Sequence, residues 1–270
     1  MMTVRSAIVL AIVYLLAVAC EDPSTMSLSS RDSNLLVVEG VITNEKANHL
    51  IRLSLPYKTQ NENPAPASGA TVQLTEDNTI VYTLTETPAG SGKYYTPEVR
   101  ASVGKNYVLS ILYQGNEFSA QDSPVPVEPL EELKYKKVND LYEVIFASSG
   151  EDASYINHAI SWKDTDACTT ETGCAGRIIF YDLKTIDVNE IYKPEKDNFY
   201  FPVNATIIRT KYSVSVRYKA FLRGVLSETE WRGGIFDVQR ADVPTNLSKG
   251  AVGFFAVSTV VSDTTIILGN

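Results

Sequence analysis

Residues suited to metal chemistry are scarce in this chain of 270 residues. It has two histidines and three cysteines, whereas a structural zinc site needs four ligands. Lys and Arg number 24 against 32 Asp and Glu, which gives a formal net charge of −8, and no basic run is present. Because nucleic-acid binding depends on clustered basic residues, we expect no nucleic-acid partner. We also expect no metal and no cofactor.

Long apolar segments are missing as well. No segment reaches 18 consecutive apolar residues, and a membrane-spanning helix needs about 20. The stretch 251–261 is interrupted by Gly253, Ser258 and Thr259, so we expect a mature chain that does not cross a membrane. Hydrophobic residues nevertheless make up 44% of the sequence and charged residues 21%, which excludes wholesale disorder.

The first twenty residues have the pattern of an export signal. Arg5 is the only charge before the 13-residue apolar run at 7–19, and a positive start followed by a short apolar run is typical of secretory signals. The run ends in Ala-Val-Ala-Cys at 17–20, which resembles the lipobox of bacterial lipoproteins. We therefore predict a signal peptide at 1–19 and a lipid such as palmitate on Cys20. The alternative is ordinary secretion with Cys20 as a plain thiol.

Residues 20–34 are predicted to be the lipidated Cys and a flexible tether. The segment is rich in serine and contains no aromatic residue, a composition typical of linkers. Glu21 and Asp22 directly after Cys20 look like the tag with which Bacteroidota carry lipoproteins to the cell surface. We expect a lipid-anchored protein on the outer membrane, facing the cell surface. Plain linker charges and the periplasmic face are the alternatives.

Residues 35–123 are predicted to form an N-terminal antiparallel β-sandwich, and this half resembles the immunoglobulin-like and transthyretin-like sandwiches. Apolar residues alternate with polar ones, and the helical period is absent. Asp77-Asn78 and Gly115-Asn116 indicate tight hairpins, because these residue types tolerate positive φ. About seven antiparallel strands are expected, at 35–43, 49–55, 70–75, 79–85, 93–96, 106–113 and 117–121.

A proline-rich segment at 124–129 predicts an extended linker, because proline fixes φ and stiffens the chain. Residues 130–270 are predicted to be a C-terminal β-rich domain with one short helix. Five-against-five alternation over 211–220 predicts a long strand near 206–222. Capping-box spacing predicts the helix at 227–232, ended by Gly233-Gly234. Other strands are expected at 141–148, 154–162 and 177–183, with a buried strand or hairpin at 253–261.

The order and spacing of several motifs resemble one bacterial family. After the Cys20 tether these motifs are LLVVEGVIT (35–43), SGATVQL (68–74), SGKYYT (91–96), GKNYVLSI (104–111), PVPVEPLEEL (124–133), a Trp-bearing segment (227–232), IFD (235–237), VPTNLSKG (243–250) and VGFFAVS (252–258). The chain resembles the Bacteroidota lipoproteins grouped as domain of unknown function 4249. The resemblance implies an outer-membrane lipoprotein associated with a TonB-dependent transporter, a β-barrel of that membrane. It implies no established activity.

Cys168 and Cys174 are a candidate disulfide pair. Five residues separate them, and an even pair at close spacing in an exported chain is typical of a disulfide that closes a small loop. Zinc is the alternative. It would need four ligands, whereas His158 lies ten residues away and no second histidine is near.

Signals for catalysis are weak. His49 and His158 lie on predicted strands, where roles on the sheet surface are expected, and no G-x-S-x-G motif is present. The acidic pairs Glu131-Glu132, Glu151-Asp152 and Asp164-Thr-Asp166 are expected to be solvated loop charges. A glycosidase would need two such acids facing each other in a cleft, so a carboxylate-dependent hydrolase remains an alternative.

Aromatic residues offer a binding surface instead. The sequence has 15 Tyr and two Trp, and such side chains combine an apolar ring with a polar tip. Trp162 and Trp231 are the candidate binding aromatics. We predict a non-enzymatic accessory or binding subunit of a TonB-dependent transport system. The alternative is a free-standing adhesin that binds glycans or proteins.

Overall fold

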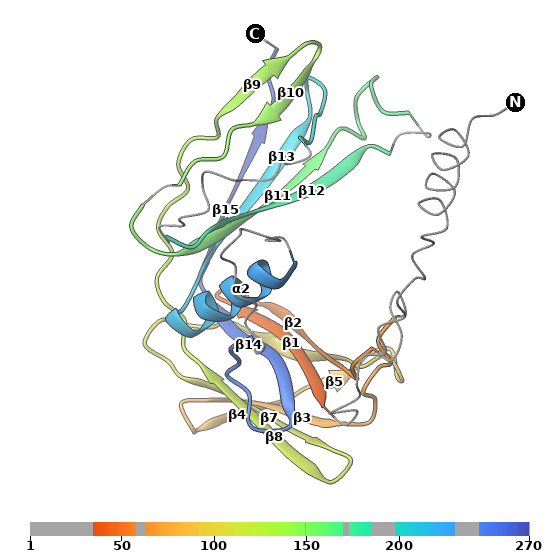
Figure 1. Cartoon of the computed structure of the whole chain (residues 1–270), viewed down its shortest axis with the longest axis vertical. Coiled ribbons are helices and arrows are strands. Elements are labelled where there is room, and N and C mark those ends of the chain that lie inside the picture. The colour runs from red at the N-terminus through yellow and green to blue at the C-terminus, as the bar shows by residue number, and fades with distance from the viewer. Residues whose placement is uncertain are drawn as a thin grey trace, which may run out of the picture. The chain divides into compact units, whose positions relative to one another are not determined.

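The computed structural model describes residues 35–57, 63–148, 150–169, 173–184, 198–229 and 243–269. Asn34–Asn270 form one compact unit. Within the described ranges the chain folds into strands β1 to β15 and the helix α2 (Figure 1), which confirms a mainly β fold with one helix. No helix in this part of the chain is long and apolar enough to cross a membrane.

Two sheets share the first hydrophobic core. One has the strand order β14-β1-β2-β6-β5 and the other β4-β3-β7-β8. Leu53 of β2 and Leu109 of β7 are both fully buried in that core, as expected where alternate residues of two sheets face each other. The strands are β1 (Leu36–Thr43), β2 (Ala47–Ser54), β3 (Thr71–Glu76), β4 (Ile80–Thr83), β5 (Thr85–Glu86), β6 (Lys93–Val99), β7 (Tyr107–Tyr113), β8 (Asn116–Asp122) and β14 (Ala251–Ser258).

The two predicted hairpin turns are both present, one of them shifted by a residue. Asp77 and Asn78 have φ of 49° and 57°, the conformation that a tight two-residue hairpin requires. In the second turn the positive φ values belong to Gln114 and Gly115. Asn116 already begins β8, so the prediction of Gly115-Asn116 is corrected by one position.

The first sheet takes its edge strand from the far end of the chain. β14 pairs in parallel with β1, from Leu36 opposite Ala251 to Thr43 opposite Ser258. Phe255 joins the first core. The prediction of an all-antiparallel sandwich confined to 35–123 is therefore corrected. A pairing between strands more than 200 residues apart leaves no local sequence pattern that could reveal it.

Gly253 permits the close approach of β14 to β1. Its φ is +98°, and a Cβ at this position would collide with the carbonyl oxygen of Val38. Only glycine combines this backbone conformation with the absence of a side chain. The pairing of β14 with β1 therefore depends on a residue that would otherwise count against a strand.

Side chains form hydrogen bonds with the backbone groups on the outer edge of β14. Asn246 donates from Nδ2 to the Phe255 carbonyl oxygen at 2.7 Å and accepts the Phe255 N–H at 3.1 Å. The Asp122 carboxylate accepts the Val257 N–H at 2.9 Å, and the Thr245 hydroxyl donates to the Gly253 carbonyl at 2.7 Å. Blocking of this kind protects an edge strand from pairing with another chain.

The second core lies under another sheet, of order β12-β11-β13-β15, and a two-stranded hairpin, β9-β10. Leu133 and Val144 contribute to this core beside Ile160 and Ile207 of the sheet. The strands are β9 (Tyr135–Val138), β10 (Leu141–Val144), β11 (Ser154–Ser161), β12 (Ala175–Asp182), β13 (Thr206–Ser213) and β15 (Val260–Ile266).

The long strand predicted near 206–222 is wrong in its second half. β13 ends at Ser213, and α2 spans Val216–Thr229. The Ser215 hydroxyl accepts the Tyr218 N–H at 3.2 Å, the bond of a helix N-cap. Tyr218 and Leu222, four residues apart, are buried on one helix face, so the alternation within 216–220 was coincidental. The helix predicted at 227–232 overlaps the end of α2, and Gly233-Gly234 lies outside the described residues.

Stacked aromatics fill a third core beneath α2. Tyr155 and Tyr212 stack with ring centroids 4.6 Å apart, and Tyr218 stacks on Phe254 of β14 at 5.0 Å. Burial raises the pKa of Tyr218 to about 12, so these phenols stay neutral near pH 7. Much of the tyrosine content predicted as a possible binding surface is thus internal packing.

Thr259 joins the sheets. It is the single residue between β14, at the edge of the sheet β14-β1-β2-β6-β5, and β15, at the edge of the sheet β12-β11-β13-β15. Its N–H donates to the Ser213 hydroxyl at 2.9 Å, and its own hydroxyl donates to the Val125 carbonyl at 2.7 Å. The segment predicted at 253–261 as a strand or hairpin is therefore two strands that belong to two different sheets.

Candidate functional site

A row of buried polar residues runs along one face of the sheet β12-β11-β13-β15, which is called the second sheet below. The pleat directs Arg209 and Lys211 of β13 to the same face, and His158 of β11 is the register partner of Arg209. All three are buried, with Lys211 only 2% exposed. Buried charges persist where they are paired or hydrogen-bonded, so the partners of each indicate what the face is built to hold.

Arg209 is paired on two sides. Its guanidinium forms an ion pair with Asp263, the residue opposite it on β15. It also donates to the Glu131 carbonyl oxygen at 2.8 Å. The first bond neutralises the buried charge, and the second holds the segment that follows the proline-rich stretch against the sheet.

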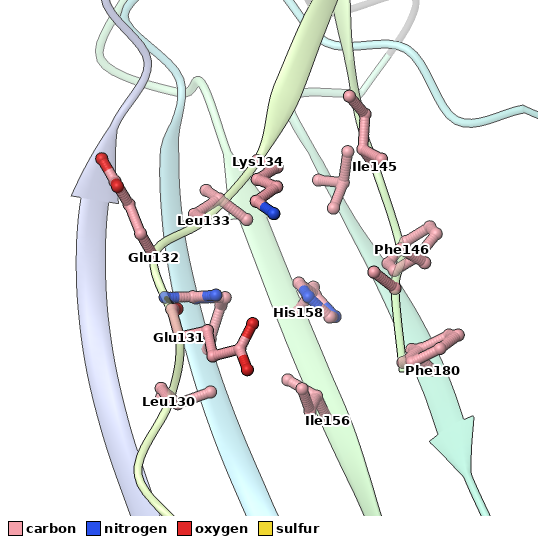
Figure 2. A pocket seen from close by; sticks show the side chains of 13 residues that line it. Leu130, Glu131, Glu132, Leu133, Lys134, Ile145, Phe146, Ile156, His158 and Phe180 are labelled. Atoms are coloured by element: carbon pink, nitrogen blue, oxygen red, sulfur yellow. Dashed lines mark hydrogen bonds between the residues drawn. The ribbon is translucent and has the colours of Figure 1, made fainter. Parts of the chain in front are cut away.

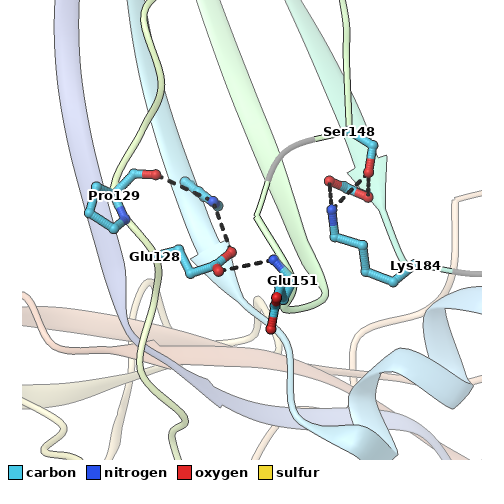
Figure 3. A network of polar contacts seen from close by, with 7 residues as sticks. Glu128, Pro129, Ser148, Glu151 and Lys184 are labelled. Carbon is cyan, nitrogen blue, oxygen red and sulfur yellow. Dashed lines mark hydrogen bonds and ion pairs between the residues drawn. The ribbon is translucent and has the colours of Figure 1, made fainter.

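Lys211 and Glu128 hold the predicted linker in the same way (Figure 3). The Lys211 Nζ lies 3.4 Å from the Pro129 carbonyl oxygen and 3.8 Å from Glu128 Oε2. Glu128 also accepts the Glu151 N–H at 3.0 Å. That backbone hydrogen bond is the main cause of the lowered pKa of Glu128. These contacts fix the segment 124–129, predicted to be a linker, to the sheet.

A second polar group in Figure 3 lies at the end of β12. Lys184 Nζ is 2.6 Å from Asp182 Oδ2 and 2.7 Å from the Ser148 hydroxyl. Ser148 in turn donates to Asp182 Oδ1 at 2.8 Å. This triad fixes residue 148 beside β12, and with it the segment that begins at the end of β10.

A cavity of about 50 Å³ opens between these two fixed segments (Figure 2). Its walls combine apolar side chains with the charged residues Glu131, Glu132, Lys134 and Arg209. His158 lies at its centre in the view. Phe146 contacts the His158 ring edge-on at 5.2 Å between centroids and stacks on Phe180 at the same distance. The lining residues are 130–134, 144–147, Ile156, His158, Phe180 and Arg209.

His158 is the chemically unusual group of this cavity. Its side chain is 3% exposed, and its Nδ1 has no hydrogen-bond partner. Burial and then the nearby Arg209 charge lower its pKa to about 4, so the ring is neutral at pH 7. A buried polar atom without a partner costs stability, so Nδ1 is an unsatisfied group within the sheet that lines the cavity.

The expectation that the two histidines serve the sheet surface is wrong, because both are buried. His49 is satisfied, with its Nε2 3.0 Å from the Val99 carbonyl oxygen and its N–H bonded to the Thr96 hydroxyl. His158 differs because it borders a cavity. The alternating pattern of its strand indicated that His158 shares a face with Ile156 and Ile160, and this was the available signal for burial.

The predicted site residues have different outcomes. Cys168 and Cys174 form a disulfide with Cα atoms 5.2 Å apart. Trp162 is half-buried, packs at 6.1 Å from the Phe199 ring and borders the second core. Cys20 and Trp231 lie outside the described residues.

The carboxylate pairs remain in loops. Glu131 and Glu132 are exposed and border the cavity, and the backbone of Glu151 serves as a donor to Glu128. Within the described ranges no group of three or more His, Cys, Asp or Glu side chains could hold a metal ion. The reading of these acids as simple loop charges missed the contribution of Glu131 to the wall of the cavity.

Comparison with known proteins gives one relationship. Residues 21–264 match the model of the family described as Domain of unknown function (DUF4249), and the chain belongs to this family. A comparison with curated proteins finds no match. The match includes strands from the sheets of both the first and the second core.

Proposed function

We propose that this protein is a lipoprotein anchored through Cys20 to the outer membrane, facing the cell surface. The observation that carries the proposal is the N-terminal pattern: one basic residue, a 13-residue apolar run and Ala-Val-Ala-Cys at 17–20. Two acyl chains with about 14 buried methylenes each would contribute at most on the order of 20 kcal/mol. Such an anchor is permanent on the timescale of the cell.

The proposed role is that of a non-enzymatic accessory or binding subunit of a TonB-dependent transport system. Membership of a family spanning residues 21–264 supports a function of the whole folded chain rather than of one motif. The cavity of about 50 Å³ is far smaller than the roughly 300–1,000 Å³ of typical small-molecule sites. This favours protein contacts over capture of a large free ligand.

Metabolic labelling tests the anchor. Cells given an alkyne analogue of palmitate should label the wild-type protein, and Cys20→Ala should abolish the label. The double variant Cys168→Ala/Cys174→Ala is the matched control, because it removes the other cysteines and should keep the label. Labelling that survives Cys20→Ala, or an unmodified Cys20 thiol in the mature protein by mass spectrometry, would contradict the proposal.

Crosslinking in intact cells followed by isolation in mild detergent tests the partner. The expected result is co-purification with a large outer-membrane β-barrel, and recovery of the protein alone would count against an accessory role. Surface exposure is checked by protease digestion of whole cells. Glu21→Ala/Asp22→Ala should then shift the protein to the protected, periplasmic face.

A binding module that acts alone is the second candidate, because the cavity is bordered by Ile145 and Phe146, which are 44% and 39% exposed. Exposed apolar groups beside a cavity favour recognition of a partner. Binding of glycans or matrix proteins by the isolated protein in the absence of any barrel would support this candidate over the first.

A further inference from the structure

We propose that the outer edge of β15 binds an extended strand of a partner protein, which would add a fifth strand to the four of the second sheet. The inference goes beyond the proposed transport role, because it names the surface and the kind of segment that binds there. It does not depend on the lipid anchor. Three features support it: unpaired backbone groups along the edge, exposed apolar side chains beside it, and an accessible carboxylate.

The hydrogen-bond pattern of β15 identifies the backbone groups that face outward. β15 is the last strand of the second sheet and pairs on one side with β13 (Figure 1). The Ser213 N–H donates to the Thr259 carbonyl at 2.9 Å, and the Ile267 N–H donates to the Ala205 carbonyl at 2.9 Å. Because hydrogen-bonded residues alternate in an antiparallel ladder, the odd-numbered residues from 259 to 267 face β13. The even-numbered residues direct their N–H and C=O groups away from the sheet.

The first of these outward residues is blocked and the next three are open. The Val260 N–H donates to Asn44 Oδ1 at 2.6 Å, and the Val260 carbonyl accepts from Asn44 Nδ2 at 3.4 Å. Among the residues that the structure describes, none pairs with the outward backbone groups of Ser262, Thr264 or Ile266. All three residues are exposed. A row of unpaired N–H and C=O groups is the surface to which an extended peptide adds as a strand.

Two edges of the first core are protected, in contrast to β15. Side chains bond to the outer edge of β14, as described above. On β8 the Ser119 N–H donates to the Ser248 hydroxyl at 3.0 Å, and the Ser119 carbonyl accepts the Ser248 N–H at 2.8 Å. Proteins block edge strands that must not pair with other chains. An edge left open in a chain that blocks others therefore favours a use for the open one.

Exposed isoleucines determine one face of the incoming strand. Ile266 is 56% exposed and Ile208 of β13 is 47% exposed. Ile208 lies opposite Thr264, and Ile266 lies opposite Thr206, so the two isoleucines are diagonal neighbours on the same face of the sheet. An apolar side chain opposite Ile266 would cover this surface, because cross-strand apolar pairs stabilise a sheet. We therefore expect β-branched residues on this face of the partner strand.

Asp263 determines the other face. Its carboxylate pairs with Arg209 but remains 36% exposed, and a carboxylate accepts about four hydrogen bonds. Arg209 supplies two of them. A Lys or Arg opposite Asp263 on the partner strand can supply another, since opposite charges at this position are favourable.

The same carboxylate argues against a second copy of this chain as the occupant. Antiparallel pairing of β15 with itself about Asp263 or Thr264 would place the two Asp263 carboxylates opposite or diagonal to each other. Like charges in these positions are unfavourable. A strand of a different protein, with a basic residue at this position, is the better complement.

Amide hydrogen exchange of the full chain, followed by nuclear magnetic resonance, provides the test. The protein is labelled in threonine and held in lauryldimethylamine oxide micelles. Thr264 directs its N–H outward, whereas the adjacent Thr265 faces β13 and is an internal control. The probe is the peptide acetyl-Ile-Thr-Val-Lys-Val-Thr-amide. Its antiparallel alignment places the isoleucine opposite Ile266 and the lysine opposite Asp263.

In the protein alone the Thr264 amide should exchange faster than the Thr265 amide, because only the second is hydrogen-bonded. The peptide should slow exchange at Thr264 saturably and leave Thr265 unchanged. Absence of protection at millimolar peptide would overturn the proposal. A Thr264 amide that is already protected in dilute protein without peptide would overturn it as well, because the edge would then be occupied.

Variants separate recognition from folding. Thr264→Pro removes one outward N–H and leaves the bonds to β13 in place, and proline is tolerated on an edge strand in this orientation. It should weaken the peptide about tenfold or more, followed on the amide of labelled Ile266. Thr264→Val is the matched control, because it keeps the N–H, and it should keep the affinity. Unchanged affinity in Thr264→Pro would contradict the proposal.

Modified peptides give the same test on the unaltered protein, should Thr264→Pro not fold. N-methylation of the isoleucine and the two valines removes the N–H groups that face β15 and should abolish binding. N-methylation of the lysine and the two threonines alters only the far edge of the peptide and should leave binding in place. Equal binding of these two peptides would overturn the proposal.

Two further measurements test the choice of occupant. A peptide with glutamate in place of the lysine should bind about threefold or more weakly, and equal affinity would contradict the role of Asp263. Protection of Thr264 that grows with protein concentration in the absence of peptide would identify a second copy as the occupant and overturn the choice of a different protein. Failure of the edge site would leave lipidation at Cys20 and the proposed transport role untouched.

Discussion

His158 and Arg209 are directly opposite each other on β11 and β13, and both are buried on the same face of the sheet. The pair places a neutral imidazole beside a guanidinium whose charge is balanced by Asp263 on the next strand. This arrangement keeps the imidazole neutral and the net charge of the buried face low. It also makes the stability of the fold sensitive to pH and to the Asp263 carboxylate.

Stability should fall between about pH 6.5 and pH 4 because of His158. Its folded pKa is about 4 and its ordinary value 6.5, so in this range the unfolded chain binds a proton that the folded chain does not. Unfolding is favoured as the pH falls, by about 3 kcal/mol in total, and the effect levels off below pH 4. Chemical denaturation at several pH values measures it.

His158→Phe should flatten that part of the pH dependence. His49 also has a lowered pKa, caused first by burial, and contributes in the same direction. His49→Phe should therefore leave the His158 contribution in place. An unchanged pH profile in His158→Phe would contradict the assignment.

Asp263→Asn should destabilise the protein by roughly 1–3 kcal/mol. The substitution leaves the Arg209 charge buried without its anionic partner, which is costly, although Asp263 is 36% exposed and water reduces the effect. Lys46→Gln is the control, because it breaks the exposed pair with Glu98 and should cost no more than about 1 kcal/mol. Equal losses of unfolding free energy in the two variants would show that burial of Arg209 is unimportant.

Gly253→Ala should be among the most damaging small substitutions, at about 3 kcal/mol or more. It adds a Cβ at a φ of +98° and against the Val38 carbonyl, so it opposes the pairing of β14 with β1. Gly104→Ala is the matched control, since Gly104 has a φ of +85° with nothing near its Cβ position. It should show only the backbone strain, about 1 kcal/mol. Thermal melts that rank the two variants the other way would refute the role of the close approach.

Loss of the Cys168–Cys174 bond should cost about 2 kcal/mol. The bond closes a seven-residue loop, and the entropy of the unfolded chain rises when the loop is released. Reduction of the wild-type protein and the double variant Cys168→Ala/Cys174→Ala should give the same loss in denaturant unfolding. A variant as stable as the oxidised protein would show that the disulfide does not stabilise the fold by restricting the unfolded chain.

Local patterns predicted most of the strands correctly. The alternation at 49–55 and 106–113 corresponds to β2 and β7, because a half-buried strand must place apolar side chains on every second residue. Alternation failed after Ser213, where a helix with a buried face of Tyr218 and Leu222 continues a polar-apolar pattern for a few residues. A window of a few residues does not distinguish the two-residue period of a strand from the 3.6-residue period of a helix.

The candidate cavity could not be predicted in the same way. It requires residues 130–134, the end of β10 and two strands of the second sheet to converge, and the contacts that bring them together, such as Arg209 to Glu131, link residues about 80 positions apart. The sequence placed His158 on a predicted strand, and the structure shows that it shares the buried face with Ile156 and Ile160. Nothing in the sequence indicated that the Nδ1 atom would lack a partner.

The sequence by itself determined the mainly β fold, most strand positions, the close pair of cysteines and the export pattern that ends at Cys20, because these depend on spacing along the chain. Only the tertiary structure decided that β14 completes the first sheet, that the proline-rich segment is fixed to the second, and that His158 borders a cavity. These features arise from contacts between distant segments, and their stabilisation appears only when the whole chain has folded.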